Sequence, residues 1–207
     1  MTKIQLNPLF SGMSGKMGNI IFKTSKNGQI YIASRPKKSK AKPSEAQLAQ
    51  RRAFAQASDY ATSALADEAM RAFYEALAEV RTTPARSLCM GDYLNEPTIA
   101  ELDFSSYKGN MGDRIRVTTS DDVGVVAVNV KITRADGTRI EKGKAVENRA
   151  GSGNWEYVAI MPIPLGTDIF IEAEGFDRPG HRAVFSVNPI VGESHEYSLT
   201  SRRVQTV

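Results

Sequence analysis

The sequence has little of the chemistry that enzymes and secreted proteins commonly use. It holds one cysteine, Cys89, which excludes an internal disulfide and fits a reducing compartment. No apolar run approaches the roughly 20 residues that a membrane-spanning helix needs. The first residues show neither the continuous apolar core nor the cleavage site of a secretory signal. We therefore expect no membrane insertion, and a protein that is cytoplasmic or assembled in a particle or filament.

Catalytic motifs are also missing. The two histidines, His181 and His195, both lie near the C-terminus, and no Walker A, Rossmann, H-E-x-x-H or paired-cysteine motif is present. The glycine-rich residues 12–18 precede a predicted strand rather than a helix, which disfavours a phosphate cradle. Cys89 falls within the apolar stripe of a predicted helix, which favours a buried, inert thiol. We expect no enzyme activity, no catalytic residue, no cofactor and no small-molecule substrate.

Three acidic turn residues leave one question open. Asp121, Asp122 and Asp177 would offer the oxygen ligands that Ca²⁺ prefers if they met at one end of a domain. Acidic residues at such positions also bend the chain through hydrogen bonds to nearby backbone N–H groups. No metal site is assigned from the sequence.

The net charge of +4 hides a strong asymmetry. Residues 1–55 hold eleven Lys/Arg and one acidic residue, a net charge of +10, whereas residues 56–207 hold sixteen Lys/Arg and twenty-two acidic residues, a net charge of −6. A basic arm on an acidic body indicates one of two partners. These are a polyanion such as nucleic acid, or the acidic body of another copy.

The most informative stretch is Gly18–Arg52. Two β-rich runs, 19–24 and 29–34, flank Asn27-Gly28, the strongest short hairpin signal. With a two-residue turn there, Phe22, Tyr31 and Ala33 share one face of the hairpin, and Ile21, Ile30 and Ile32 share the other. Such a ribbon is not stable alone in water. We expect it to contact a second molecule together with the cations that follow it: the self-association or polyanion contact residues are Phe22, Ile30, Tyr31, Ile32, Arg35, Lys37, Lys38, Lys40, Lys42, Arg51 and Arg52.

Composition divides the rest of the chain, and the fold class that we predict is α+β. We expect an extended arm over 1–43, a helical module over 44–96, an immunoglobulin-like antiparallel β-sandwich over 97–190 and a tail over 191–207. Residues 1–18 are read as extended and partly mobile. In the tail, Tyr197, Leu199, Val204 and Val207 fit a frayed end or a strand that pairs with a neighbour.

Capping signals place the helices, and alternation places the strands. Ser44 caps the first helix, Asp67 the second and Thr83 the third, with Pro84 at its first helical position. The second helix is predicted to bury Met70, Phe73, Tyr74, Leu77 and Val80. Trp155 is expected in the sandwich core. Strands are predicted near residues 98–104, 113–119, 124–133, 138–147, 155–162, 167–174 and 182–188.

Two stretches resemble known families. Ser14-Gly15-Lys16-Met17-Gly18, the hairpin, Arg35-Pro36-Lys37-Lys38 and the helix from Glu45-Ala46-Gln47 resemble an uncharacterised bacterial family. Its pattern is S-G-K-x-G, a β-hairpin, a basic R-x-P-K-K segment and a T-E-A-Q-x-x-Q-R helix. The resemblance covers about 40 residues and implies no activity.

Residues 98–188 are similar to bacterial Ig-like domains. The similarity lies in residues 119–125, in the strand of Trp155 and in Asp177-Arg178-Pro179-Gly180, which departs from the common D-x-A-G-N ending at Pro179 and His181. It implies an Ig-like sandwich. Modules of this kind serve as spacers, adhesins and assembly units, so the resemblance does not choose a function.

The function predicted from the sequence is that of a structural protein that self-assembles through its hairpin arm into a homo-oligomer or polymer. A filament, a surface layer and a virion component of bacterial or phage origin all fit. The alternative is a nucleic-acid-binding protein whose basic arm lies on the phosphate backbone, although no aromatic ladder accompanies the charges. A third possibility, an adhesin that binds through its sandwich loops, would need an export route.

Overall fold

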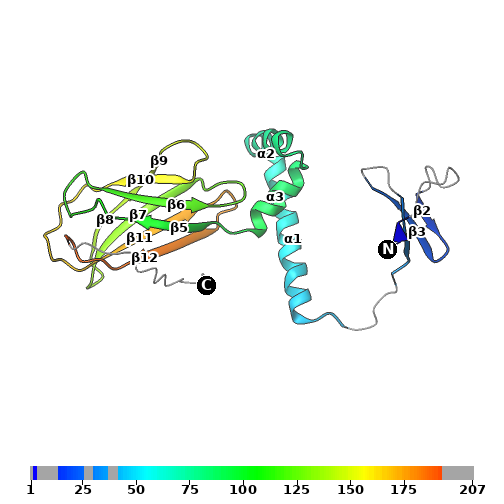
Figure 1. The fold of residues 1–207 in the computed structure, drawn as a ribbon, viewed down its shortest axis with the longest axis horizontal. Helices are drawn as coiled ribbons and strands as arrows, with labels where there is room; N and C mark the ends of the chain where they lie inside the picture. Colours follow the sequence, from blue (N-terminus) through cyan, green and yellow to red (C-terminus); the bar gives the residue numbers. More distant parts are fainter. Residues whose placement is uncertain (1, 4–13, 26–29, 37–41, 193–207) are drawn as a thin grey trace. The chain divides into compact units, whose positions relative to one another are not determined.

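The computed structural model describes residues 2–3, 14–25, 30–36 and 42–192. It divides into two units, residues 1–45 and 46–207 (Figure 1). The first unit is a small β-sheet. The second unit contains three helices followed by two β-sheets, which confirms the predicted α+β class.

The β-sandwich consists of two antiparallel four-stranded sheets with the strand orders β5-β6-β10-β9 and β12-β11-β7-β8. These orders match the ABED and GFCC′ sheets of Ig-like domains. The predicted strands are all present, with shifted ends, but the strand predicted over 138–147 is divided into β8 and the short β9, which belong to opposite sheets. Their bounds are Thr98–Asp103 (β5), Arg114–Ser120 (β6), Ala127–Arg134 (β7), Arg139–Lys144 (β8), Val146–Glu147 (β9), Asn154–Val158 (β10), Ile169–Phe176 (β11) and Arg182–Val187 (β12).

The sandwich core follows from period-two alternation, because successive side chains of a strand point to opposite faces. Trp155 is 7% exposed, and its indole N–H donates to Thr119 Oγ1 at 3.2 Å, which confirms its predicted core position. The inward side chains of the central strands are fully buried or nearly so: Ile115 and Val117 of β6, Val128, Val130 and Ile132 of β7, and Ile169, Ile171 and Ala173 of β11.

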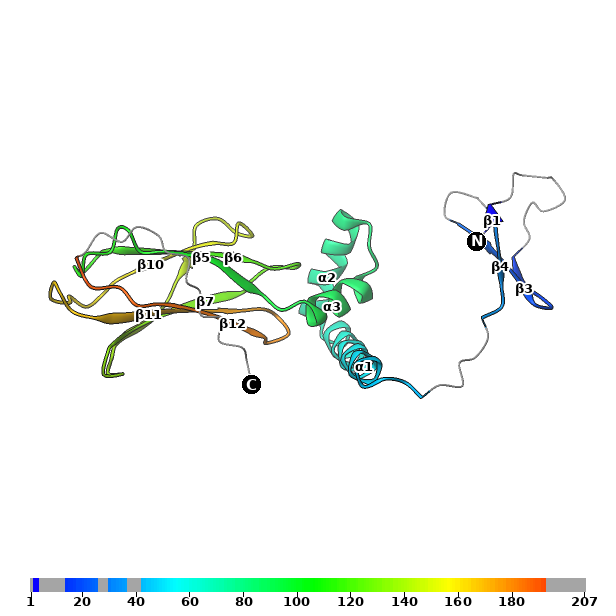
Figure 2. The ribbon, with the colours of Figure 1, turned by 60° about the horizontal axis from the view of Figure 1, so that its bottom comes forward.

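Three helices precede the sandwich: α1 (Glu45–Ala66), α2 (Glu68–Arg81) and α3 (Ala85–Leu94) (Figure 2). The helix α1 begins directly after Ser44, as its capping pattern predicts. Asp67 caps α2 by accepting a hydrogen bond from the Met70 backbone N–H at 2.9 Å. Pro84, predicted as the first helical residue of α3, instead occupies the cap position that was predicted for Thr83. It supplies no side-chain hydrogen bond to the helix.

The helices pack through small residues of α1 against α2 and α3. Ala61, Ala64, Tyr74, Leu88 and Cys89 form the buried cluster. Alanine allows the helix axes to approach closely, which suits this packing. The expectation that Val80 is buried was wrong. It is 83% exposed, because it lies one residue before the end of α2 and outside the helical cluster.

Candidate functional site

The N-terminal sheet, our candidate site, has four antiparallel strands in the order β1-β4-β3-β2. Its strands are Thr2–Lys3 (β1), Gly15–Met17 (β2), Ile20–Thr24 (β3) and Ile30–Ser34 (β4). The predicted hairpin is therefore present as β3 and β4. Residues 15–17, predicted as extended and partly mobile chain, instead pair with β3, and residues 2–3 pair with β4.

The register of the hairpin differs from the prediction by one residue. Thr24 is opposite Ile30 and Phe22 is opposite Ile32, whereas a two-residue turn would place Thr24 opposite Tyr31. Residues 26–29, which include Asn27-Gly28, lie outside the described residues. A slip of one residue turns every side chain of β4 to the other face. Phe22 therefore shares a face with Ile32, not with Tyr31 and Ala33, because directly opposed residues lie on the same side.

The sheet buries very little of its own apolar surface. Among its described side chains only Ile30 is buried, at 6% exposure. Phe22, Tyr31 and Ile32 are half-buried, while Met17 and Ile20 are 66% and 43% exposed. A full burial of one such side chain contributes about 1.5–3 kcal/mol. Most of that stabilisation is not realised among the described residues of the sheet.

The candidate cations that the structure describes are exposed. Arg35 donates its backbone N–H to the Asn19 carbonyl at 2.8 Å, which extends the hairpin by one hydrogen bond. Lys42 lies just before α1, and Arg51 and Arg52 lie on it, in the second unit. Within the described residues none of these four side chains forms an ion pair. Lys37, Lys38 and Lys40 lie outside the described residues.

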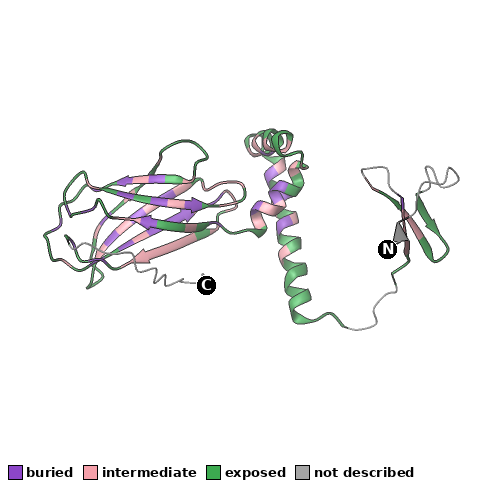
Figure 3. Ribbon diagram, in the orientation of Figure 1, coloured by how far each residue is buried: buried purple, intermediate pink, exposed green. Residues whose placement is uncertain are grey.

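The first three turns of α1 are not packed. Residues 45–56 are all exposed except the half-buried Ala53, and Phe54 is 58% exposed (Figure 3). Burial starts at Ala57 and continues through Ala61 and Ala64. The exposed half of α1 therefore carries Arg51, Arg52 and Phe54 to solvent, next in sequence to the basic segment.

A polar network that the sequence did not reveal lies within the helices. The Tyr74 hydroxyl donates to Asp92 Oδ2, and the Tyr60 and Tyr74 hydroxyls are 3.0 Å apart. Asp92 and Tyr74 are both 0% exposed, and Asp92 Oδ1 has no hydrogen-bond partner among the described residues. The only sequence signal was an acidic residue between Cys89 and Tyr93 on an apolar helix.

The network lies next to the junction between helices and sandwich. The Arg178 guanidinium sits over the Phe73 ring at 3.7 Å, and the His181 and Tyr93 rings make an edge contact at 5.1 Å. Val123 packs on the helical cluster. These contacts, with Asn95 donating to Asp122, define what we call the junction.

The three acidic turn residues are used by the fold itself. Asp121 Oδ2 accepts from the backbone N–H groups of Val123 and Gly124, and Asp177 Oδ1 accepts from those of Gly180 and His181. His181 Nδ1 is 2.7 Å from Asp177 Oδ2. In the part of the chain that the structure describes, no group of three or more His, Cys, Asp or Glu side chains has the arrangement of a metal site.

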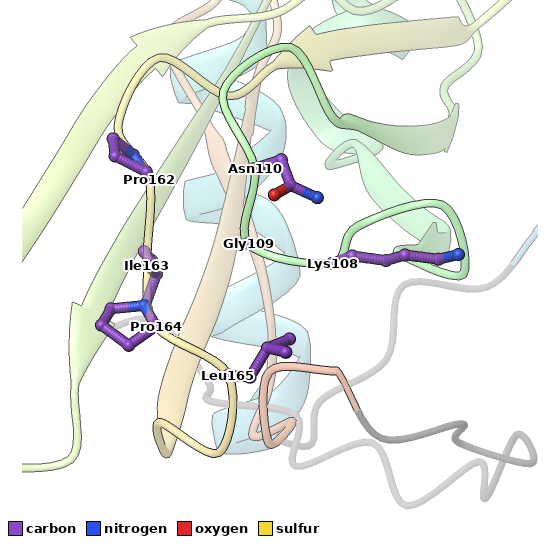
Figure 4. A pocket seen from close by; sticks show the side chains of 7 residues that line it. All are labelled: Lys108, Gly109, Asn110, Pro162, Ile163, Pro164 and Leu165. Atoms are coloured by element: carbon purple, nitrogen blue, oxygen red, sulfur yellow. The ribbon is translucent and has the colours of Figure 1, made fainter.

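Two further features bear on catalysis, the Cys89 thiol and a surface hollow. Cys89 is 0% exposed, and burial raises the pKa of its thiol to about 11, which fits the predicted inert thiol. A shallow hollow lies at the loops 108–110 and 162–165 (Figure 4). Proline and aliphatic side chains form one wall, and Lys108 extends away from Pro162 and Pro164, so no acid–base pair converges there.

No helix of the described residues is both long and apolar enough to cross a membrane.

The comparisons with known proteins return little. No family model and no curated protein matches the sequence. Among solved structures, the chain is similar to one described as the tetra-tandem repeat in the extending region of a large adhesion protein. The match has 19% identity and a TM-score of 0.33 over 46% of this chain. This chain covers 24% of the length of that structure.

Proposed function

We propose that this chain is a non-enzymatic structural protein that self-assembles through its N-terminal sheet. The observation that carries the proposal is that a four-stranded sheet forms a unit of its own while burying one described side chain, Ile30. A sheet this small needs a covered apolar face to be stable in water. A second copy of the chain supplies that cover.

The edges of the sheet favour strand addition. Among the described residues, the outer strands β1 and β2 contain two and three residues, and β4 and β3 extend beyond the positions that they pair with. Backbone groups on such an edge pair readily with a strand of another chain, and neighbouring side chains then bury together. The acceptor in this proposal is a sheet edge of the next copy.

Charge supports the same partner. The arm is strongly basic and the remaining chain is acidic. The described cations Lys16, Lys23, Arg35, Lys42, Arg51 and Arg52 are exposed and form no ion pair with a described residue. Lys37, Lys38 and Lys40 add to this charge and are proposed to lie against acidic residues of the neighbour. Opposite charges at an interface mainly raise the association rate and fix the register.

Deletion of residues 1–43 tests the proposal. We expect the full chain to sediment as oligomers whose size grows with concentration, and the truncated chain to sediment as a monomer with a folded sandwich, reported by Trp155 fluorescence. Phe22→Ser and Ile21→Ser alter the two faces of the sheet separately. Met111→Ser, at a 73% exposed turn position outside the strands, is the matched control. Normal assembly of the truncated chain would show that the arm is not the connector.

The same exposed cations support nucleic acid as the second candidate partner. A gel-shift titration against salt separates the two, because binding to phosphates falls steeply between about 50 and 200 mM salt. If the free protein is monomeric and binds nucleic acid in this salt-dependent way, nucleic-acid binding replaces self-assembly as the proposed function.

A further inference from the structure

The junction contains a buried acid whose environment is poorly matched to a negative charge. Asp92 is 0% exposed, and only its Oδ2 atom accepts a hydrogen bond, from Tyr74. Oδ1 is buried with no partner. A buried carboxylate normally has both oxygens hydrogen-bonded or ion-paired, because removal from water penalises the charged form.

The surrounding groups add to this penalty. The side chains of Asp121 and Asp177 approach from the sandwich loops with charge of the same sign, and Arg178 is the cation that opposes them. Arg178 is already engaged, because its Nη1 donates to the Gly124 carbonyl at 3.2 Å and its guanidinium lies over Phe73. The titratable and charged groups that face Asp92 are Tyr60 of α1, Tyr74 of α2, Cys89 of α3, and Asp121, Asp177, Arg178 and His181 of the sandwich loops.

We propose that Asp92 makes the junction between the helices and the sandwich pH-sensitive. When Asp92 carries a proton, the helices hold firmly to the sandwich. When Asp92 is ionised, the junction opens more readily. This device is independent of self-assembly, although it would change how rigidly the arm-bearing helices are connected to the sandwich.

The direction of the pH effect follows from the difference in the proton affinity of Asp92 between the closed and open forms of the junction. Burial raises the pKa of Asp92 to about 6, with Asp121 and Asp177 acting in the same direction, while the Tyr74 hydrogen bond and Arg178 lower it. In an open junction water reaches the carboxyl, and its pKa returns to about 4. The closed form therefore gains stability as the pH falls below 6 and loses it as the pH rises through 6. The opening equilibrium constant should rise about tenfold between pH 5 and pH 8.

The Cys89 thiol reports the opening. It is 0% exposed in the buried cluster on which Val123 of the sandwich packs, so a maleimide reaches it only when this part of the junction opens. The labelling rate of the full chain, divided by the rate in denaturant at the same pH, gives the open fraction without the pH dependence of the thiol itself. We expect this fraction to rise about tenfold from pH 5 to pH 8 and to be flat in Asp92→Asn. An equal slope in Asp92→Asn overturns the proposal.

His181 contacts Asp177 at the junction, with Nδ1 2.7 Å from Asp177 Oδ2. His181→Asn separates its contribution. A slope that survives in His181→Asn and vanishes in Asp92→Asn supports the proposal, and the reverse pattern overturns it. Carboxyl ¹³C titration of the unmodified chain needs no variant to fold. A midpoint near 6 for Asp92 supports the proposal, and one near 4 overturns it.

Discussion

Replacing Tyr74 with Phe tests the buried network most directly. The substitution keeps the ring, which is 0% exposed and contacts Phe73 at a centroid distance of 5.3 Å. It removes the hydroxyl that donates to Asp92 and pairs with Tyr60. No cavity of consequence forms, so the change in stability reports the hydrogen bonds alone.

The cost depends on the charge of Asp92. A hydrogen bond to a charged group contributes about 1.5–3 kcal/mol, and one between neutral groups about 0.5–1.5 kcal/mol. At about pH 7.5 Asp92 is ionised, because its raised pKa is about 6. Without Tyr74 both carboxylate oxygens would be buried and unpartnered. We therefore expect Tyr74→Phe to lower the free energy of unfolding by about 2–3 kcal/mol at that pH, and by about 1 kcal/mol near pH 5.

Urea unfolding of the full chain measures this with two signals. Far-ultraviolet circular dichroism follows the helices, and fluorescence of the single tryptophan, Trp155, follows the sandwich. In the Asp92→Asn background the Tyr74→Phe substitution removes only a neutral hydrogen bond, so a double-mutant cycle should give a coupling of about 1–2 kcal/mol. A cost below about 0.5 kcal/mol at both pH values, with no coupling, would refute the reasoning.

Two further predictions concern the sandwich. Glu174, 6% exposed, contacts Lys142 at 2.9 Å and Arg182; burial acts to raise its pKa, but these partners outweigh burial and lower it. Near neutral pH, Glu174→Gln should lower the free energy of urea unfolding by about 1 kcal/mol, a modest amount because both partners are partly exposed. In acid the carboxylate is protonated, so the cost should be smaller, and an unchanged cost in acid would contradict this. In Gly153→Ala, at φ +69°, the new Cβ would lie 2.5 Å from the Thr119 carbonyl oxygen. This substitution should lower the free energy of unfolding by about 2 kcal/mol or more. The control Gly137→Ala, at φ +84° with no atom within 4 Å of the new Cβ, should cost about 1 kcal/mol. Equal costs would exclude the contact with Thr119 as the cause.

The sandwich was predictable because its strands repeat one simple rule. The strands β6, β7 and β10 alternate between a buried and a more open face, as in β7, where Val128, Val130 and Ile132 are buried and their neighbours are not. Turn residues separate the strands at short intervals. The prediction failed only at ends and interruptions, such as the strand predicted over 138–147, which crosses from one sheet to the other between β8 and the two-residue β9.

The helices show where local patterns stop being informative. Capping located α2 because the Asp67 carboxylate and its Met70 N–H partner lie within one turn. The exposure of Val80 and the burial of Asp92 depend instead on where other elements lie, which local periodicity does not encode. Asp92 is buried where Tyr74, eighteen positions away, donates to it, and where Val123 and His181 of the sandwich loops contact the helices.

The candidate site was the least predictable part, because a hairpin register depends on a single residue in the turn. The observed pairing of Thr24 with Ile30 leaves residues 25–29 between the strands, an odd number, whereas a two-residue turn leaves an even number. The positions of the strands and the exposure of the cations are independent of the hairpin register. The set of side chains on each face depends on it.

The corrected register changes what a partner must cover. Ile20, Phe22, Ile30 and Ile32 now share one face of the N-terminal sheet, and Ile21 and Tyr31 share the other. Met17, opposite Ile20, lies on the first face too, so the first face holds five large apolar side chains and the second holds two. The first face therefore gains more from burial. A partner that docks on the first face and pairs with one edge satisfies most of the sheet. Assembly should therefore be more sensitive to Phe22→Ser than to Ile21→Ser, and the opposite order would mean that the partner covers the other face.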